Sequence, residues 1–157
     1  MKRDTKSSPH LDLSPLHLLH RAGQRAGDVF NAEIGSLELT PRQFAVLATV
    51  ASAEGLSQPD LVERTGIDRS TLADIVARML KKGLLQRRRT KDDARAYAVR
   101  LTEEGQRLLQ LAKPRVETVD QRLLDTVPEI HRQQFLEALA LLVEALGQPG
   151  ALIARPR

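Results

Sequence analysis

A mainly α-helical domain with one small β-hairpin, an α+β fold, is the fold class that the sequence predicts. Apolar residues recur at helical spacing along most of the chain, and the pairs Ser14-Pro15 and Thr40-Pro41 are typical helix starts. The pattern changes to alternation only once, between residues 84 and 101. The 157 residues are enough for one ordinary domain with its own core.

The first helix is expected over residues 15–37, with Ser14 as its N-cap. It contains Gly23 and Gly27, each of which costs about 1 kcal/mol relative to alanine in a helix interior. Their four-residue spacing places both on one side, where another backbone or a ligand could come close. The alternative is that this helix is merely weak.

Three shorter helices are expected next. The second begins at Thr40-Pro41 and ends at Glu54-Gly55, and Ser57 caps a third that ends at Gly66. Asp68 caps a fourth helix that stops at Gly83. The expected buried face of that helix consists of Leu72, Ile75, Val76, Met79 and Leu80, which leaves Arg69, Ser70, Ala73, Asp74 and Ala77 facing outward.

The hairpin and two long helices complete the chain. Residues 84–89 and 96–101 are predicted as strands with residues 90–95 as the hairpin tip. A helix then begins at Thr102-Glu103 with a bend expected near Pro114, and Pro128 precedes a last helix that ends at residue 146. Residues 1–10 and 147–157 are expected to be flexible tails.

Composition excludes several classes of function. The chain has no cysteine, which rules out disulfides, thiolate metal sites and cysteine-based redox switches. Four aromatic residues are too few for single-strand binding by base stacking. No apolar run approaches the roughly 18–20 residues of a membrane span, and no secretory signal is present. We therefore expect a cytosolic protein with no membrane partner.

Positive charge is concentrated in one segment. The whole chain carries +4, yet residues 64–100 hold eleven basic and four acidic side chains, which leaves −3 for the remainder. A basic block within a mildly acidic frame is typical of a polyanion binder. A merely solvated basic face is the alternative on charge alone.

The order of the elements distinguishes these two interpretations. A helix, a short helix, a glycine turn, a helix and a basic hairpin form a winged helix-turn-helix, whose second helix enters the major groove of DNA. Arg69 can bond guanine and Asp74 can accept from cytosine, although an ion pair between Asp74 and Arg78 is equally expected. Arg95 at the hairpin tip can reach a minor groove, with Asp93 holding it or the turn.

The remaining basic residues of the hairpin are expected to contact phosphates, which position the protein without specifying a sequence. They include Arg87, Arg88, Arg89 and Lys91. The residues predicted to contact DNA are Ser57, Gln58, Arg69, Ser70, Thr71, Asp74, Arg78, Arg89, Lys91, Asp93 and Arg95.

Short motifs in the middle of the chain resemble the MarR family of bacterial transcription regulators. They occur in the order LTPRQFAVL, LSQ, DRSTL, GLLQR, DAR and LTEEG, beginning at residues 39, 56, 68, 83, 93 and 101. Many members of that family carry Thr and Arg where this chain has Ala73 and Asp74. The operator sequence is therefore not carried over.

The resemblance implies a homodimer on double-stranded DNA. Residues 11–38 and 103–146 would be the dimerisation helices around residues 39–102, the DNA-binding module. The wide apolar stripes of the terminal helices support this independently, because a small module could not cover them alone. A two-fold dimer predicts a pseudo-palindromic operator with half-sites about 34–36 Å apart.

The resemblance also implies a small-molecule effector that releases the DNA. The segment from His17 to Phe30 further resembles regulators of aromatic-acid catabolism, whose effectors include aryl-CoA thioesters. The candidate ligand residues are His17, His20, Arg21, Gln24, Arg25, Phe30, Arg42 and Phe44. For His20, Phe30 and Phe44 ordinary packing is the favoured alternative. His17 and His20 alone do not predict a metal site, and no cofactor is expected.

The predicted function is therefore a homodimeric, DNA-binding transcriptional repressor that an aromatic acid or its CoA thioester releases. An enzyme is not expected, because the sequence has no glycine-rich phosphate loop, nucleophile elbow or metal-ligand cluster. The remaining alternative is a winged-helix module that binds proteins rather than DNA. The basic block argues against that alternative.

Overall fold

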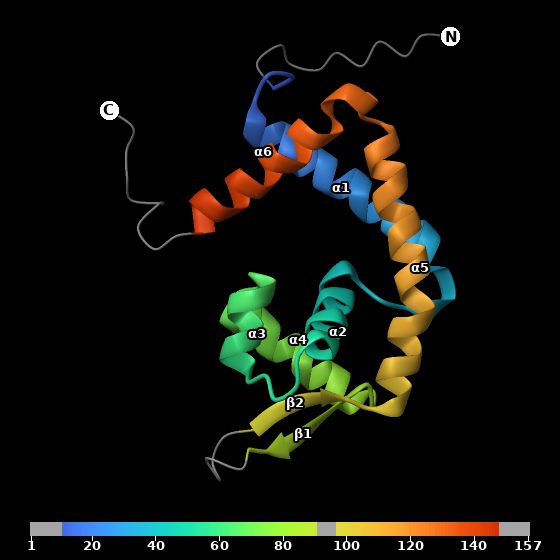
Figure 1. Ribbon diagram of the computed structural model, residues 1–157, viewed down its shortest axis with the longest axis vertical. Coiled ribbons are helices and arrows are strands. Elements are labelled where there is room, and N and C mark those ends of the chain that lie inside the picture. Colours follow the sequence, from blue (N-terminus) through green and yellow to red (C-terminus); the bar gives the residue numbers. More distant parts are fainter. Residues whose placement is uncertain (1–10, 91–96, 148–157) are drawn as a thin grey trace.

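Residues 11–90 and 97–147 are described by the computed structural model (Figure 1). The expected tails and the hairpin tip therefore lie mostly outside the described residues. The elements, in order, are α1 (Pro15–Ile34), the 3-10 turn η1 (Gly35–Leu37), α2 (Pro41–Ser52), α3 (Gln58–Thr65), α4 (Arg69–Lys81), β1 (Leu85–Arg89), β2 (Tyr97–Leu101), α5 (Glu103–Asp125) and α6 (Glu129–Gly147). The predicted fold class, mainly α with one antiparallel hairpin, is confirmed.

Capping side chains fix the starts of the helices where the sequence predicted them. Ser14 accepts a hydrogen bond from the backbone N–H of His17, and Thr40 forms a reciprocal capping box with Gln43. Ser57 forms another with Asp60. These side chains satisfy backbone donors that a helix start leaves unpaired, so the predicted starts are confirmed.

The first helix ends three residues earlier than predicted. It stops at Ile34 because Gly35 adopts φ +52° and ψ −124°, a backbone conformation incompatible with a continued helix. The 3-10 turn η1 then carries the chain to Leu37. The apolar spacing continued through this turn, which is why the pattern alone did not reveal the break.

Three other boundaries differ by one or two residues. The helix α2 ends at Ser52 rather than at Glu54-Gly55, because Ala53 adopts an extended backbone with φ −154° and ψ 140°. The first strand begins at Leu85 rather than at residue 84, because the N–H of Leu84 bonds the Met79 carbonyl and so closes the end of α4. The last helix includes Gly147, which the sequence placed in the C-terminal tail. Helix ends commonly vary by one residue, and glycine is compatible with the last helical position. The helix α5 continues through Pro114.

A single apolar core joins the elements. Val46 and Leu47 of α2 belong to the same core cluster as Leu72 and Val76 of α4, and all four side chains are fully buried. Burying a side chain of this size contributes about 1.5–3 kcal/mol. Phe30 and Ile34 of α1 and Leu109 and Ala112 of α5 extend the same core.

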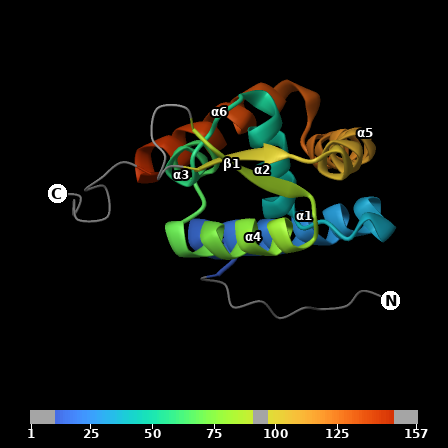
Figure 2. The ribbon, with the colours of Figure 1, turned by 90° about the horizontal axis from the view of Figure 1, so that it is seen from below.

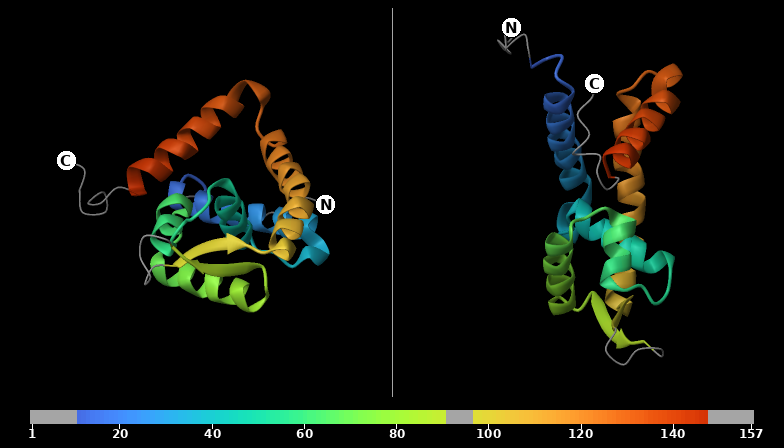
Figure 3. Two further views of the ribbon diagram at one scale, coloured as in Figure 1. Left: turned by 60° about the horizontal axis from the view of Figure 1, so that its bottom comes forward. Right: turned by 90° about the vertical axis from the view of Figure 1, so that its left-hand side faces the viewer.

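The helix α5 runs along the length of the molecule and links its two ends (Figures 1 and 3). The hairpin, α3 and α4 lie at one end. At the other end α6 buries no side chain, and it lies apart from α1 in Figures 2 and 3. No helix within the described residues has the length and apolarity needed to cross a membrane.

Candidate nucleic-acid interface

The outer side of α4 is the surface that the sequence predicted. Leu72, Val76 and Met79 are fully buried. The side chains expected to face outward, namely Arg69, Ser70, Ala73, Asp74 and Ala77, are all exposed. The helix therefore presents a polar stripe that is free of core contacts along its N-terminal half.

The N-terminal turn of α4 is held by its cap. Asp68 accepts a hydrogen bond from the Thr71 N–H at 2.9 Å. The Thr71 side chain is half-buried. Hydrogen bonding to the Thr71 side chain and to its backbone N–H, with a smaller contribution from the nearby charge of Arg42, holds the pKa of the Asp68 carboxyl below its usual value. The cap thus fixes the first turn of α4, from which the side chains of Arg69 and Ser70 project.

Asp74 and Arg78 form the ion pair that the sequence offered as one of two interpretations. Arg78 Nη2 lies 3.0 Å from Asp74 Oδ2, and both side chains are more than half exposed. An exposed pair of this kind adds little stability. Its effect is to orient Arg78 along the outer side of α4 in the DNA-free chain.

The helix α3, which packs against α4, begins with a cap of its own. The hydroxyl of Ser57 donates to Asp60 Oδ2 at 2.7 Å and also accepts from the Asp60 N–H. The Ser57 hydrogen bonds lower the pKa of Asp60. Ser57 and Gln58 are half-buried, so the Ser57 hydroxyl is engaged in capping before any other contact is made.

The hairpin divides its arginines between two faces. Neighbouring side chains in a strand point to opposite sides, so Arg87 and Arg89 share one face and Arg88 lies on the other. Tyr97 lies opposite Arg89 in the register and is 46% exposed. Three predicted contacts at the tip, Lys91, Asp93 and Arg95, lie outside the described residues. Figure 2 shows α4 and the hairpin together at the end viewed from below.

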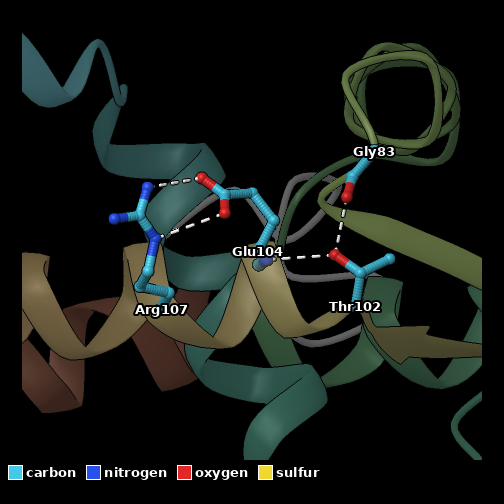
Figure 4. Close-up of polar contacts among 5 residues, drawn as sticks. Gly83, Thr102, Glu104 and Arg107 are labelled. Atoms are coloured by element: carbon cyan, nitrogen blue, oxygen red, sulfur yellow. Dashed lines mark hydrogen bonds and ion pairs between the residues drawn. The ribbon is translucent and has the colours of Figure 1, made fainter.

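Thr102 joins α4, the hairpin and α5 (Figure 4). Its hydroxyl donates to the Gly83 carbonyl at 2.6 Å and accepts from the Gly105 N–H at 3.0 Å, while its backbone N–H donates to the Leu84 carbonyl at 3.1 Å. Nearby in α5, Glu104 pairs with Arg107 at 2.9 Å, which lowers the pKa of Glu104. The end of α4 is therefore fixed directly to the start of α5.

Three of the predicted ligand residues line one shallow pocket on α1. It measures about 450 Å³ and opens beside Gly27, around which an added methyl group would meet no atom. Arg25 lies 3.5 Å from Asp28. The lining residues are Arg21, Gln24, Arg25, Gly27, Asp28 and Asn31. His17 is half-buried and His20 exposed on the same helix.

The single chain does not bring the other predicted ligand residues to that pocket. Phe30 is 5% exposed within the core, and Phe44 is half-buried against the core, so packing accounts for both. Arg42 instead lines a separate pocket of about 420 Å³ beside Thr65 and Asp68, next to the start of α4. Their predicted role as ligand contacts remains a proposal.

Sequence reasoning missed one polar cluster behind the hairpin. Arg100 of β2 lies opposite Gln86 of β1, and its Nη2 is 3.9 Å from Glu54 Oε2 at the end of α2. The alternation of the strands could have placed Gln86 and Arg100 on one face. The approach of Glu54 depends on the tertiary fold and leaves no local signal.

A family model described as the MarR family matches residues 37–96, which include α2, α3, α4 and β1. The transcriptional regulator HosA of Escherichia coli O111:H- is 32% identical over 108 residues, which span 69% of this chain and 80% of HosA. The region matched by the family model therefore includes α4, whose outer side forms the candidate interface.

Two solved regulators have the same fold. PcaV of Streptomyces coelicolor, in complex with its natural ligand, is 32% identical with a TM-score of 0.80, and the match covers 86% of this chain and 95% of PcaV. The transcriptional repressor CouR bound to a 23-mer DNA duplex is 28% identical with a TM-score of 0.79, covering 87% and 97%. CouR bound to p-coumaroyl-CoA is 27% identical with a TM-score of 0.80, covering 88% and 97%.

Proposed function

The chain belongs to the MarR family of transcriptional regulators, and from that premise we propose that it is a homodimeric repressor released from a pseudo-palindromic operator by a small aromatic acid or its CoA thioester. Residues 39–102 are the proposed DNA-binding module. Residues 11–38 and 103–146 are the proposed dimerisation segments.

The observation that carries DNA binding is the exposed polar side of α4 beside a basic hairpin. The exposed side chains of Arg69 and Ser70 project from the capped first turn of α4, and Arg78 lies farther along the same helix. The N-terminal residues of such a helix contact base edges, while hairpin arginines such as Arg89 contact phosphates. The DNA-bound CouR structure, similar over most of this chain, supports the same use of the fold.

Unpartnered apolar side chains support the homodimer. Leu13 and Leu16 near the start of α1 are 85% and 68% exposed, and Ile130 and Val143 of α6 are 81% and 71% exposed. Large apolar side chains exposed on both terminal helices are typical of an interaction surface. A second copy of the chain that packs its own terminal helices on these surfaces would bury them in a symmetric interface.

The shallow pocket on α1 is proposed to form part of the effector site. Arg21 and Arg25 supply positive charge for the carboxylate of an aromatic acid or a phosphate of the CoA group, and Gly27 leaves room beside the helix backbone. His17, His20 and Gln24 lie on the same helix. Phe30, Arg42 and Phe44 would join them only if the dimer or a bound ligand changes their surroundings. PcaV with its natural ligand and CouR with p-coumaroyl-CoA motivate the ligand class.

A mobility-shift titration tests this function directly. The probe is the intergenic DNA beside the gene, measured at two salt concentrations, with and without aromatic acids and their CoA thioesters. Tight, salt-dependent binding that one compound releases is the expected result. Binding that no compound releases would contradict the effector class. The absence of sequence-selective binding would favour the protein-binding module instead.

A further inference from the structure

A polar pocket of about 340 Å³ lies behind the hairpin, between the end of α2, the two strands and the start of α5. We call it the hairpin pocket. Val50, Ala51 and Ala53 form part of its apolar wall. Its polar lining residues are Glu54, Gln86, Arg88, Arg100 and Gln106. Of these residues, only Arg88 is also among the hairpin arginines expected above to contact DNA phosphates.

Arg100 has an unsatisfied donor in this pocket. Its Nε atom is shielded from solvent and has no hydrogen-bond partner within the described part of the chain. The Glu54 carboxylate lies near it, but the Nη2–Oε2 distance of 3.9 Å is too long for a hydrogen bond, and the Arg100 and Glu54 side chains are 41% and 92% exposed. A shielded donor of this kind favours an acceptor that enters from outside.

The strand register places further donors around Arg100. Gln86 lies directly opposite Arg100, and Arg88 is the next residue on the same face, opposite the small side chain of Ala98. Within the described residues, Gln86 Nε2 donates to the Leu101 carbonyl at the long distance of 3.4 Å. With Glu54 counted, the pocket has a net charge of +1.

We propose that the hairpin pocket binds a small oxyanion, a carboxylate or a phosphate, whose oxygen accepts the hydrogen bond from Arg100 Nε. A guanidinium group presents its donors in a planar fork that matches two oxygens of such an anion. The volume of the pocket is within the range of small-molecule sites. This proposal goes beyond DNA binding and does not depend on it, because it concerns the opposite face of β1 from Arg87 and Arg89.

The Nε–Hε signal of Arg100 in a ¹H–¹⁵N NMR spectrum gives a direct test. The signal is assigned from its loss in Arg100→Lys, and sodium benzoate or inorganic phosphate is then titrated against the full chain at constant ionic strength. We expect a saturable shift of this signal with at least one probe. Benzoate alone would indicate a carboxylate ligand, and phosphate alone a phosphate ligand.

Three variants separate a built site from general attraction of anions. Glu54→Gln removes a competing negative charge and is expected to tighten probe binding about three- to tenfold, while Arg88→Gln weakens it by a similar factor. Arg87→Gln is the matched control, since it removes the same charge one residue away on the other face. Its affinity for the probe is expected to be unchanged.

Several results would overturn the proposal. One is the absence of a saturable shift with both probes, which would leave water as the partner of Arg100 Nε. Others are an equal shift with chloride, or equal losses of affinity in Arg88→Gln and Arg87→Gln. A shift produced by a DNA duplex but by neither free anion would assign Arg100 to the DNA-contacting surface instead.

Discussion

Arg115 of α5 donates a hydrogen bond from Nη1 to the backbone carbonyl of Ile34 at 2.8 Å, although the two residues are 81 positions apart in the chain. Ile34 is the last residue of α1, where helix carbonyls lose their intrahelical partners. The contact therefore caps α1 from another helix. It lies beside Gly35, where an added methyl group would be 3.7 Å from the same guanidinium nitrogen.

Arg115→Ala is expected to lower the free energy of unfolding by about 1.5–3 kcal/mol, the range for hydrogen bonds to charged groups. The half-buried position of Arg115 strengthens the bond relative to an exposed one. Urea unfolding followed by circular dichroism measures the change. Arg107→Ala, which removes an exposed pair on the same helix, is the control and is expected to have little effect. Equal effects of both variants would contradict a specific capping role.

Gly105→Ala is expected to destabilise the chain by about 1–3 kcal/mol or more, because overpacking forces the backbone to shift. An added Cβ would lie only 2.0 Å from the Leu84 carbonyl oxygen, which is a backbone atom that cannot rotate away. Thermal unfolding measures the loss. The comparison is Gly23→Ala in α1, where no atom lies within 4 Å and a gain of up to about 1 kcal/mol is expected. Similar melting temperatures for the two variants would refute the close approach.

Asp68 makes stability dependent on acid pH. Its pKa lies below the usual value of 3.8, because the carboxylate accepts from Thr71 and lies near Arg42. The stabilisation is fully present above the unfolded-state pKa and is lost as the pH falls through the lower, folded-state pKa. Urea unfolding between pH 6 and pH 2 should show this loss. Asp68→Asn keeps an acceptor that does not titrate, so its acid dependence should be weaker; an unchanged slope would exclude Asp68 as a contributor.

Arg69→Ala is expected to relax base preference at one operator position, by about 1–3 kcal/mol of discrimination, if its guanidinium bonds a guanine. Competition binding with single-base operator variants measures this. Arg95→Ala, at the predicted hairpin tip, should instead weaken binding at moderate salt and reduce its salt dependence. A uniform loss across all sequences with Arg69→Ala would make Arg69 a phosphate contact, and unchanged affinity with Arg95→Ala would remove the tip from the mechanism.

Val143→Glu is expected to shift the proposed dimer toward monomer. The side chain is 71% exposed on α6, and burying a new charge in an apolar interface is costly. Light scattering after size-exclusion chromatography gives the mass of each species. Gln134→Glu adds the same charge to α6 at an exposed polar position and should leave the dimer intact. A dimer that persists in Val143→Glu would place the interface elsewhere.

Local signals explain why the elements could be predicted. Thr40, Ser57 and Asp68 act within three residues of their own positions, so the starts of α2, α3 and α4 follow from the sequence alone. The exposed side of α4 follows from its helical period, and the Asp74–Arg78 pair from its four-residue spacing.

Contacts between distant segments could not be predicted in this way. The bond from Arg115 to Ile34, the approach of Leu84 to Gly105 and the position of Glu54 near Arg100 all depend on how completed helices pack. The candidate ligand residues show the same limit. Arg42 follows a clear helix start, yet the fold places it beside Asp68 rather than with Arg21 and Arg25.

The unbroken helix α5 has a mechanical consequence. Its 23 residues, which include Pro114 where the sequence predicted a bend, form one continuous rod about 35 Å long, with Thr102 anchoring one end to α4 and α6 following the other. Such a rod acts as a lever. A rotation of about 5° at the α6 end would displace the α4 end by roughly 3 Å, close to the roughly 3.4 Å rise of one base step. In the proposed dimer, a small change in the angle between the two copies would therefore move α4 out of step with its half of the proposed two-fold DNA site.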